Sequence, residues 1–280
     1  MGERCLIVQD FDLRLTLESG QFFRYEEHGE GYLLLTQGKA VVIRQEDGAL
    51  CYGGADEEFI RHLFQLVPQY DERIARLRAD PVLLPVVAMY PGLRVMRQDL
   101  HEATLGFICS SMSNIPKIRL NLRLIAQSCG RVVGGHAHLP LPGQELDLGA
   151  VTAAKTGYRA KFLVGTNALL TGDMLNELSV ADYDHSHELL KSLPGIGPKV
   201  ADCICLFALG HGEAFPVDVH VLRAMQALFP HEHFSDERRA RDFAQHRWGK
   251  DAGLAQQFIF QWARDNLARK VRKVEVIACL

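Results

Sequence analysis

The first fifty residues alternate between apolar and polar positions, as the strands of a half-buried sheet do. In LRLTLES, Leu13, Leu15 and Leu17 alternate with polar neighbours, which predicts a strand over residues 13–19. Further strands are expected in QFFRYEE, GYLLLTQ and AVVIRQ, separated by the turn-like segments HGEG and QGK. The pattern therefore predicts a small antiparallel meander.

Past these strands the apolar spacing changes to that of helices. Ile60, Leu63 and Val67 lie on one helical face, and similar patterns continue to the end of the sequence. The expected helices cover residues 70–79, 98–111, 115–128, 157–170, 184–192, 198–209, 219–228, 236–247 and 253–270. We predict an α+β fold, mostly α, with an N-terminal antiparallel sheet domain with flanking helices at 1–95 and a helical domain at 96–280.

Composition narrows the class of protein. The 280 residues are 48% hydrophobic and 23% charged, and they contain no apolar run of membrane-spanning length. Charges interrupt MGERCLIVQDFD where a signal peptide needs an apolar core. Seven cysteines at irregular spacing suit reduced thiols better than a disulfide framework. We expect a monomer without membrane contact, located in the cytoplasm and nucleoid, or in the nucleus of a eukaryote.

The net charge of −3 conceals an uneven distribution. Residues 1–90 hold 9 Lys/Arg against 15 Asp/Glu, whereas residues 91–280 hold 22 against 19. A basic face that binds an acidic polymer is therefore compatible with the acidic total.

The segment LPGIGPKVADCICL predicts two helices joined by a tight hairpin. Gly195 and Gly197 permit unusual backbone angles, and Pro198 suits the first position of a helix. Backbone N–H groups at such a bend approach a phosphate closely. A plain helical connector has the same pattern, so the hairpin alone leaves both interpretations open.

Two charged residues next to this hairpin suggest chemistry. Lys199 falls in the first helical turn, where the helix dipole disfavours a cation, and an unprotonated amine is a nucleophile that forms Schiff bases. Asp218 precedes the apolar-periodic run VHVLRAMQAL, so it is an expected N-cap. A carboxylate fixed there also accepts a proton or stabilises a developing sugar cation. An exposed lysine and a simple cap are the alternatives.

Together, LPGIGPKVADCICL and PVDVHV resemble the helix-hairpin-helix DNA glycosylase superfamily, and the chain is similar to its 8-oxoguanine DNA glycosylases. SGQFFRY, MRQDL, FICSSMSNI, GYRAKF and AGLAQQFIF follow in the family's order over nearly the whole chain. The resemblance implies a base-excision repair glycosylase and AP lyase, with duplex DNA containing 8-oxoguanine bound in its cleft. Lys199 would attack C1′, expel the base and cleave the strand by β-elimination, while Asp218 would stabilise the oxocarbenium-like transition state.

The base pocket is expected from the same resemblance. Cys203 lies four residues after Lys199, on the same helix face, and Gln256 and Phe260 have the same spacing. A flipped purine would lie between the Cys203 sulfur and the Phe260 ring, with Gln256 reading its Watson–Crick edge. Core packing is the alternative for Phe260. The family assigns the carbonyl of Gly20 to N7–H, a donor that 8-oxoguanine has and guanine lacks.

The resemblance also assigns contacts with the DNA. The expected DNA-binding residues are Met112, Asn114, Lys117, Tyr158, Arg159, Gly195, Gly197 and His220. Tyr158 matches a wedge and Arg159 a reader of the opposite base, while His220 meets a backbone phosphate. Lys117 replaces a second arginine of the family and Met112 an asparagine, which we expect to loosen discrimination for cytosine.

No cofactor is expected to be required. The carbonyls of Leu193 and Ile196 are candidates for holding a structural monovalent or calcium-like ion at the hairpin. Cys203 and Cys205 are too close for usual cluster spacing, and only Cys279 follows, so no iron–sulfur cluster is expected.

Two other functions share part of this sequence pattern. A glycosylase for alkylated purines needs an aromatic-lined pocket and no lysine nucleophile, which Lys199, Cys203 and Gln256 oppose. A catalytically silent DNA-binding module would use the hairpin alone and leave Asp218 unexplained.

Overall fold

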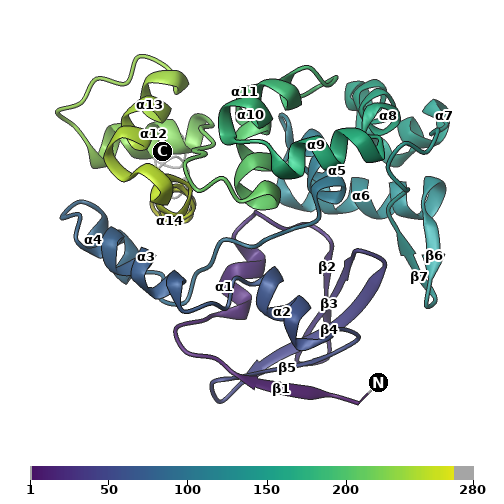
Figure 1. Ribbon diagram of the computed structural model, residues 1–280, viewed down its shortest axis with the longest axis horizontal. Coiled ribbons are helices and arrows are strands. Elements are labelled where there is room, and N and C mark those ends of the chain that lie inside the picture. Colours follow the sequence, from purple (N-terminus) through teal and green to yellow (C-terminus); the bar gives the residue numbers. More distant parts are fainter. Residues whose placement is uncertain (1, 268–280) are drawn as a thin grey trace, which may run out of the picture.

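The computed structural model describes residues 2–267, and Figure 1 shows a sheet unit on one side of a larger helical body. The five-stranded antiparallel sheet has the order β1-β5-β4-β3-β2. Its strands are β1 (Arg4–Ile7), β2 (Tyr25–His28), β3 (Gly31–Thr36), β4 (Lys39–Glu46) and β5 (Ala49–Gly53). The predicted α+β class and the meander from β2 to β4 are confirmed.

The first predicted strand is wrong, because residues 13–19 form a helix instead. Helix α1 (Leu13–Glu18) begins at Asp12, whose carboxylate accepts a hydrogen bond from the Leu15 N–H at 2.7 Å. Leu13 and Leu17 are both buried and lie one turn apart on the same helical face. Over only seven residues, the alternation of apolar and polar positions is therefore compatible with a helix as well as with a strand.

The expectation that the cysteines are reduced is wrong for one pair. Cys5 in β1 and Cys51 in β5 occupy directly opposite positions of the ladder and form a disulfide. The two cysteines lie 46 positions apart in the sequence, so their spacing did not indicate that they pair. Cys109, Cys129, Cys203 and Cys205 are free thiols.

The predicted helices are present with small shifts at their ends, whereas the helices at Leu83–Ala88, Leu148–Val151 and Gly172–Val180 were not predicted. The helices after α1 are α2 (Glu57–Leu63), α3 (Gln69–Arg78), α4 (Leu83–Ala88), α5 (Leu100–Ser110), α6 (Ile115–Cys129), α7 (Leu148–Val151), α8 (Ala160–Leu169), α9 (Gly172–Val180), α10 (Tyr183–Lys191), α11 (Pro198–Ile204), α12 (Val219–Leu228), α13 (Glu237–Trp248) and α14 (Ala252–Asn266). The short irregular turns are η1 (Thr152–Thr156), η2 (Gly157–Arg159), η3 (Cys205–Leu209) and η4 (Gly249–Asp251). The last three positions of the helix predicted at 253–270 lie outside the described residues.

The helical body also contains a β-hairpin that was not predicted from the sequence. Strands β6 (Arg131–Val133) and β7 (His136–His138) pair through a two-residue turn. Gly134 and Gly135 both have positive φ, as the tightest hairpin turns require. Their Gly-Gly pair was the signal for this hairpin in the sequence.

Two apolar cores fill the molecule, and each takes buried side chains from both sides of residue 95. The sheet core includes α1, α2 and Met96. The helical core takes in α3 and α4, with Tyr70, Leu77 and Leu83 buried in it, and α4 packs on α14. The division into 1–95 and 96–280 stays a prediction. Within the described part of the chain, no helix has both the length and the apolar character needed to span a bilayer.

Candidate active site

A small cavity lies where the N-terminal segment meets the helical body, and we call it the lysine pocket. It is lined by Gly20, Phe107, Lys199, Cys203, Phe207, Pro216, Asp218, Gln256, Gln257 and Phe260. The six residues that the sequence assigned to catalysis and base recognition all belong to this lining. Its volume is about 50 Å³, far below the roughly 300–1,000 Å³ of typical ligand pockets. The pocket must therefore widen before it can hold a purine.

Lys199 reaches the pocket from the start of α11, directly after the hairpin. Gly195 has φ +79°, and a Cβ at this position would lie 2.5 Å from the Cβ of Phe162. Gly197 is the N-cap of α11, with Pro198 in its first turn. Only glycine fits the bend at Gly195, because any side chain would meet both backbone strain and Phe162. The Lys199 Nζ lies 6.0 Å from the centre of the Phe107 ring.

A buried carboxylate that the sequence analysis missed holds α11 in place. Asp202 is fully buried, accepts a hydrogen bond from the Tyr183 hydroxyl at 2.6 Å and pairs with Arg241 at 2.9 Å. Tyr183 belongs to α10 and Arg241 to α13, so this one side chain ties three helices together beneath Lys199. An acidic residue within the apolar run KVADCICL was the signal for this role.

Cys203 lies one turn after Lys199 and is buried. Burial raises the pKa of its thiol to about 11, and the nearby Lys199 offsets only part of this effect. The group is therefore a neutral thiol at physiological pH, a soft and polarisable surface for a flat ring.

Asp218 is the N-cap of α12, as the sequence predicted. Its Oδ1 accepts hydrogen bonds from the backbone N–H groups of His220 at 2.9 Å and Val221 at 2.8 Å. Both bonds use the same oxygen, and within the described residues Oδ2 accepts none. The cap thus fixes the carboxylate while leaving one oxygen for the pocket.

Gln256 and Phe260 present one turn of α14 to the pocket. Gln256 is 5% exposed and donates from Nε2 to the Pro216 carbonyl at 3.1 Å. Its Oε1 is buried without a hydrogen-bond partner in the described part of the chain. A buried acceptor left unpaired is costly, so it indicates a ligand that donates hydrogen bonds. Phe260 is only partly buried, which separates it from its core neighbours Phe258 and Ile259.

Gly20 forms the opposite wall of the pocket. It has φ +83°, and an added Cβ would lie 3.1 Å from Ile115 Cδ1 and 3.2 Å from Phe260 Cε1. The fully buried Gln21 anchors the turn, because it bonds the carbonyls of Thr16 and Arg94 and accepts from the Met96 N–H.

A second glutamine supports this turn from the helical body. Gln257 donates from Nε2 to the Ser19 carbonyl at 3.2 Å, which joins α14 to the residue before Gly20. Sequence reasoning passed over both Gln21 and Gln257, although uncharged polar residues within apolar segments often have such bonding roles.

Predicted DNA-facing residues lie in the loop before α6 and in the turn η2. Met112 is 92% exposed and has φ +47°, an uncommon backbone state for a residue with a side chain. Tyr158 is 55% exposed. Arg159, by contrast, is 3% exposed, and its guanidinium donates to the carbonyls of Ser111 and Met112. In this conformation Arg159 supports the loop, and its reading of the opposite base stays a prediction.

The remaining predicted contacts lie at helix ends. Asn114 caps α6 by accepting from the Lys117 N–H at 3.0 Å, and Lys117 and His220 are both exposed. At the hairpin, the Leu193 carbonyl already accepts from the Ile196 N–H at 3.3 Å. Each carbonyl keeps a second lone pair, so the donor set remains compatible with a cation.

Similarity to known proteins shows which family this chain belongs to. Residues 6–104 match the family model for the 8-oxoguanine DNA glycosylase N-terminal domain. Over 286 residues the chain is 30% identical to the N-glycosylase/DNA lyase OGG1 of Arabidopsis thaliana, covering 90% of this chain and 77% of the relative. The chain belongs to this N-glycosylase/DNA lyase family. The resemblance identified in the sequence is thereby confirmed.

Other members of the family match along nearly their whole length. A probable N-glycosylase/DNA lyase of Methanothermobacter thermautotrophicus is 28% identical over 297 residues, covering 92% of this chain and 95% of the relative. The 8-oxoguanine glycosylase/lyase of Clostridium acetobutylicum, solved with double-stranded DNA containing cytosine opposite 8-oxoG, is 30% identical. Its TM-score is 0.85, with 92% of this chain and 93% of that chain covered.

The fold alone does not identify the base that is excised. A 3-methyladenine DNA glycosylase of Archaeoglobus fulgidus has a TM-score of 0.74 to this chain at 18% identity. Glycosylases named for different bases therefore share this architecture, and the choice between them depends on the residues of the pocket.

Proposed function

We propose that the protein is a DNA repair glycosylase and AP lyase that excises 8-oxoguanine from duplex DNA and cleaves the strand through Lys199. The observation that supports this most is the lysine pocket itself, which brings Lys199, Asp218, Cys203 and Gln256 together. A lysine beside a carboxylate suits nucleophilic attack at a sugar carbon, and family membership supports the same chemistry.

In the proposed reaction the damaged nucleotide leaves the helical stack and enters the widened pocket. The Lys199 amine attacks C1′, the bond from C1′ to the base breaks, and its electron pair leaves with the base. The Oδ2 of Asp218 stabilises the positive charge that develops on the sugar. The adduct opens the sugar ring to an imine, loss of a C2′ proton follows, and the 3′ phosphate is eliminated.

Selection of the lesion would use both walls of the pocket. The Gly20 carbonyl accepts from N7–H of 8-oxoguanine and repels the N7 lone pair of guanine. The unpaired Oε1 of Gln256 accepts from the N–H donors on the Watson–Crick edge. A glycosylase for alkylated purines gains nothing from either acceptor, and it has no use for Lys199.

The DNA-facing residues complete the proposal. Exposed Met112 and Tyr158 would wedge into the opened stack, and Lys117 and His220 both present exposed polar ends. Lys117 makes a single-point contact where an arginine would make two, so we propose a looser preference for cytosine opposite the lesion.

The proposal also includes three features of the protein as a whole. It would act as a monomer, in the nucleoid or nucleus, and the carbonyls of Leu193 and Ile196 would hold an optional cation.

Borohydride trapping on duplexes that carry 8-oxoguanine opposite each base tests this function. Wild-type protein should give a covalent adduct that Lys199→Gln abolishes, because the glutamine amide cannot form an imine. Base release without trapping would support an alkylated-purine glycosylase, and binding without release a silent DNA-binding module. Either result would overturn the proposal.

A further inference from the structure

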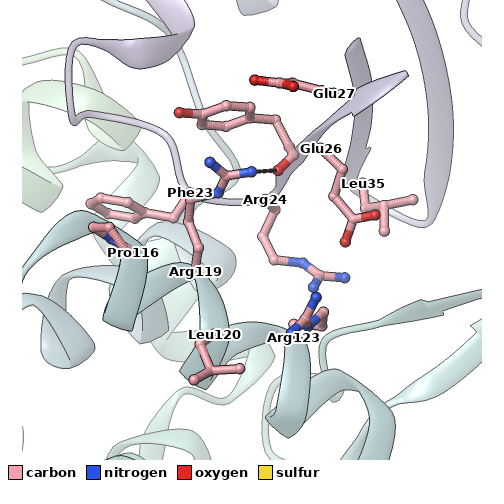
Figure 2. Close-up of a pocket in the computed structure, with 10 residues that line it drawn as sticks. Phe23, Arg24, Glu26, Glu27, Leu35, Pro116, Arg119, Leu120 and Arg123 are labelled. Atoms are coloured by element: carbon pink, nitrogen blue, oxygen red, sulfur yellow. Dashed lines mark hydrogen bonds between the residues drawn. The ribbon is translucent and has the colours of Figure 1, made fainter. Parts of the chain in front are cut away.

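A larger and more open cavity lies between the sheet edge and α6, and we call it the arginine pocket (Figure 2). Its volume is about 470 Å³. It is lined by Phe23, Arg24, Tyr25, Glu26, Glu27, Leu35, Pro116, Arg119, Leu120 and Arg123. None of these residues takes part in the chemistry proposed for the lysine pocket.

Three guanidinium groups converge on this pocket. Arg119 and Arg123 lie one turn apart on α6, while Arg24 enters from the segment that leads into β2. Figure 2 shows the Arg24 and Arg123 guanidinium groups pointing toward one another. Among the described residues, neither group forms an ion pair with a carboxylate, although the charges of Glu102 and Glu26 act on Arg24 from nearby.

Arg24 is the most informative of the three. It is 8% exposed and donates one hydrogen bond, from an NH2 group to the Ala137 carbonyl at 2.6 Å. Its Nε is buried and has no hydrogen-bond partner in the described part of the chain. Burial lowers the pKa of Arg24, although Glu102 and Glu26 work against that effect. A buried cation with an unsatisfied N–H donor destabilises the protein unless a ligand accepts that hydrogen bond and balances the charge.

The other groups around the pocket fit this assignment. Arg119 donates to the Tyr25 carbonyl at 2.6 Å, and its guanidinium lies 4.0 Å above the Tyr25 ring, which leaves other N–H groups for a ligand. The carboxylates of Glu26 and Glu27 are exposed and therefore well screened by solvent. Glu102 lies behind Arg24 and is held by the Thr36 hydroxyl at 2.6 Å and the Gln37 N–H at 2.9 Å.

We propose that the arginine pocket is an anion site that takes a phosphate group. Guanidinium forks match the tetrahedral oxygens of phosphate, and several acting together are the usual protein solution for it. The first turn of the same helix carries Lys117, so a nucleic-acid backbone that passes Lys117 is one source of this phosphate. A free phosphate or nucleotide is the other source.

The experiment compares Arg123→Ala with Arg4→Ala. Arg123 is exposed on α6, so its loss should leave the fold intact, and Arg4 is an equally exposed arginine at the opposite edge of the sheet. Binding to undamaged duplex is measured against salt concentration, and thermal unfolding is measured with added inorganic phosphate at constant ionic strength.

If the backbone supplies the phosphate, Arg123→Ala lowers the slope of log K against log salt by about 0.9, the value for one phosphate contact, and Arg4→Ala does not. If free phosphate is the ligand, it raises the unfolding midpoint of wild type and of Arg4→Ala, and raises that of Arg123→Ala much less. The proposal is overturned if Arg123→Ala behaves like Arg4→Ala in both measurements.

The duplex arm rests on the proposed function, since it assumes a DNA-binding protein. Its failure and the failure of the glycosylase assignment remain distinguishable, because undamaged duplex offers no lesion to trap. A protein that traps no borohydride adduct but shows the slope change would lose the first proposal and keep the second.

Discussion

The lysine pocket and the arginine pocket use neighbouring parts of one segment, because Gly20 lines the first, whereas residues 23–27 line the second together with α6. The first is about 50 Å³ and is lined by a neutral thiol and hydrogen-bonded groups. The second is about 470 Å³ and is lined by three arginines and two glutamates. The residues proposed for catalysis line the smaller cavity, so cavity size alone does not locate them in this molecule.

Replacing the Asp218 carboxylate should have the largest effect on the lysine pocket. In Asp218→Asn the amide oxygen still caps α12, but the charge that stabilises the sugar cation is lost. We expect base release to slow by about 10²- to 10⁴-fold, a typical range for a catalytic side chain, with an unchanged unfolding midpoint. Single-turnover excision and thermal melts measure the two effects. A variant that kept full activity would reduce Asp218 to a helix cap.

Gly20→Ala should have a smaller effect, confined to the same pocket. A side chain at φ +83° costs about 1–2 kcal/mol, and the new methyl would press on Ile115 and Phe260. We expect excision of 8-oxoguanine to fall by about tenfold, with no change in the salt dependence of duplex binding. Equal losses on damaged and undamaged duplex would remove Gly20 from lesion recognition.

Glu102 links the arginine pocket to stability. Burial, and then the charge of Asp99, raises the pKa of Glu102 to about 7. The folded protein therefore binds this proton more tightly than the unfolded chain, so the stability that Glu102 contributes falls as pH rises from about 4.5 to about 7.

The glutamine of Glu102→Gln does not titrate, so the stability of this variant does not fall over the same pH range. Its hydrogen bonds to Thr36 and Gln37 remain available. Because Glu102 is only partly enclosed, solvent screening limits the expected gain to about 1–2 kcal/mol at pH 8, with none at pH 4. Urea unfolding at both pH values measures it. A gain of the same size at both would show that the charge of Glu102 is irrelevant.

The smallest effect concerns Cys203. Since burial raises the pKa of its thiol to about 11, alkylation should be slow at neutral pH and should rise about tenfold per pH unit until that value. Peptide mass spectrometry after iodoacetamide treatment measures the rate, with the less buried Cys129 as the internal reference. Rapid labelling of Cys203 at pH 7 would contradict a closed pocket.

Much of the lysine pocket could be predicted because its residues fall in short segments with strong local signals. Spacing places Lys199 and Cys203 on one helix face and Asp218 at a helix start, whereas the resemblance to the family assigned Gly20, Gln256 and Phe260 to the same pocket. Gln21, Asp202 and Gln257 were missed because their partners are distant in sequence. Each satisfies backbone or side-chain groups on another element, and one sequence does not display such pairs.

The errors in the fold have a similar origin. Leu13 and Leu17 fit a strand and a helix equally well over so short a window, and the cap at Asp12 decided between them. Cys5 and Cys51 meet only because β1 joins the sheet beside β5, far along the chain. The buried state of Arg159 also depends on a tertiary contact, with the loop at Ser111 and Met112.

The border between the two cores affects how this fold can be recombined with its relatives. Tyr70, Leu83 and Val86 precede residue 95 yet are buried in the helical core. A chimera joined at residue 95 would exchange these side chains without the partners shaped to receive them. A seam near residue 67, before α3, keeps Tyr70, Leu83 and Val86 with the helical core, and among the described buried core residues it leaves only Phe23 and Met96 to cross it. It is therefore the better place to graft one family member's sheet onto another's helices.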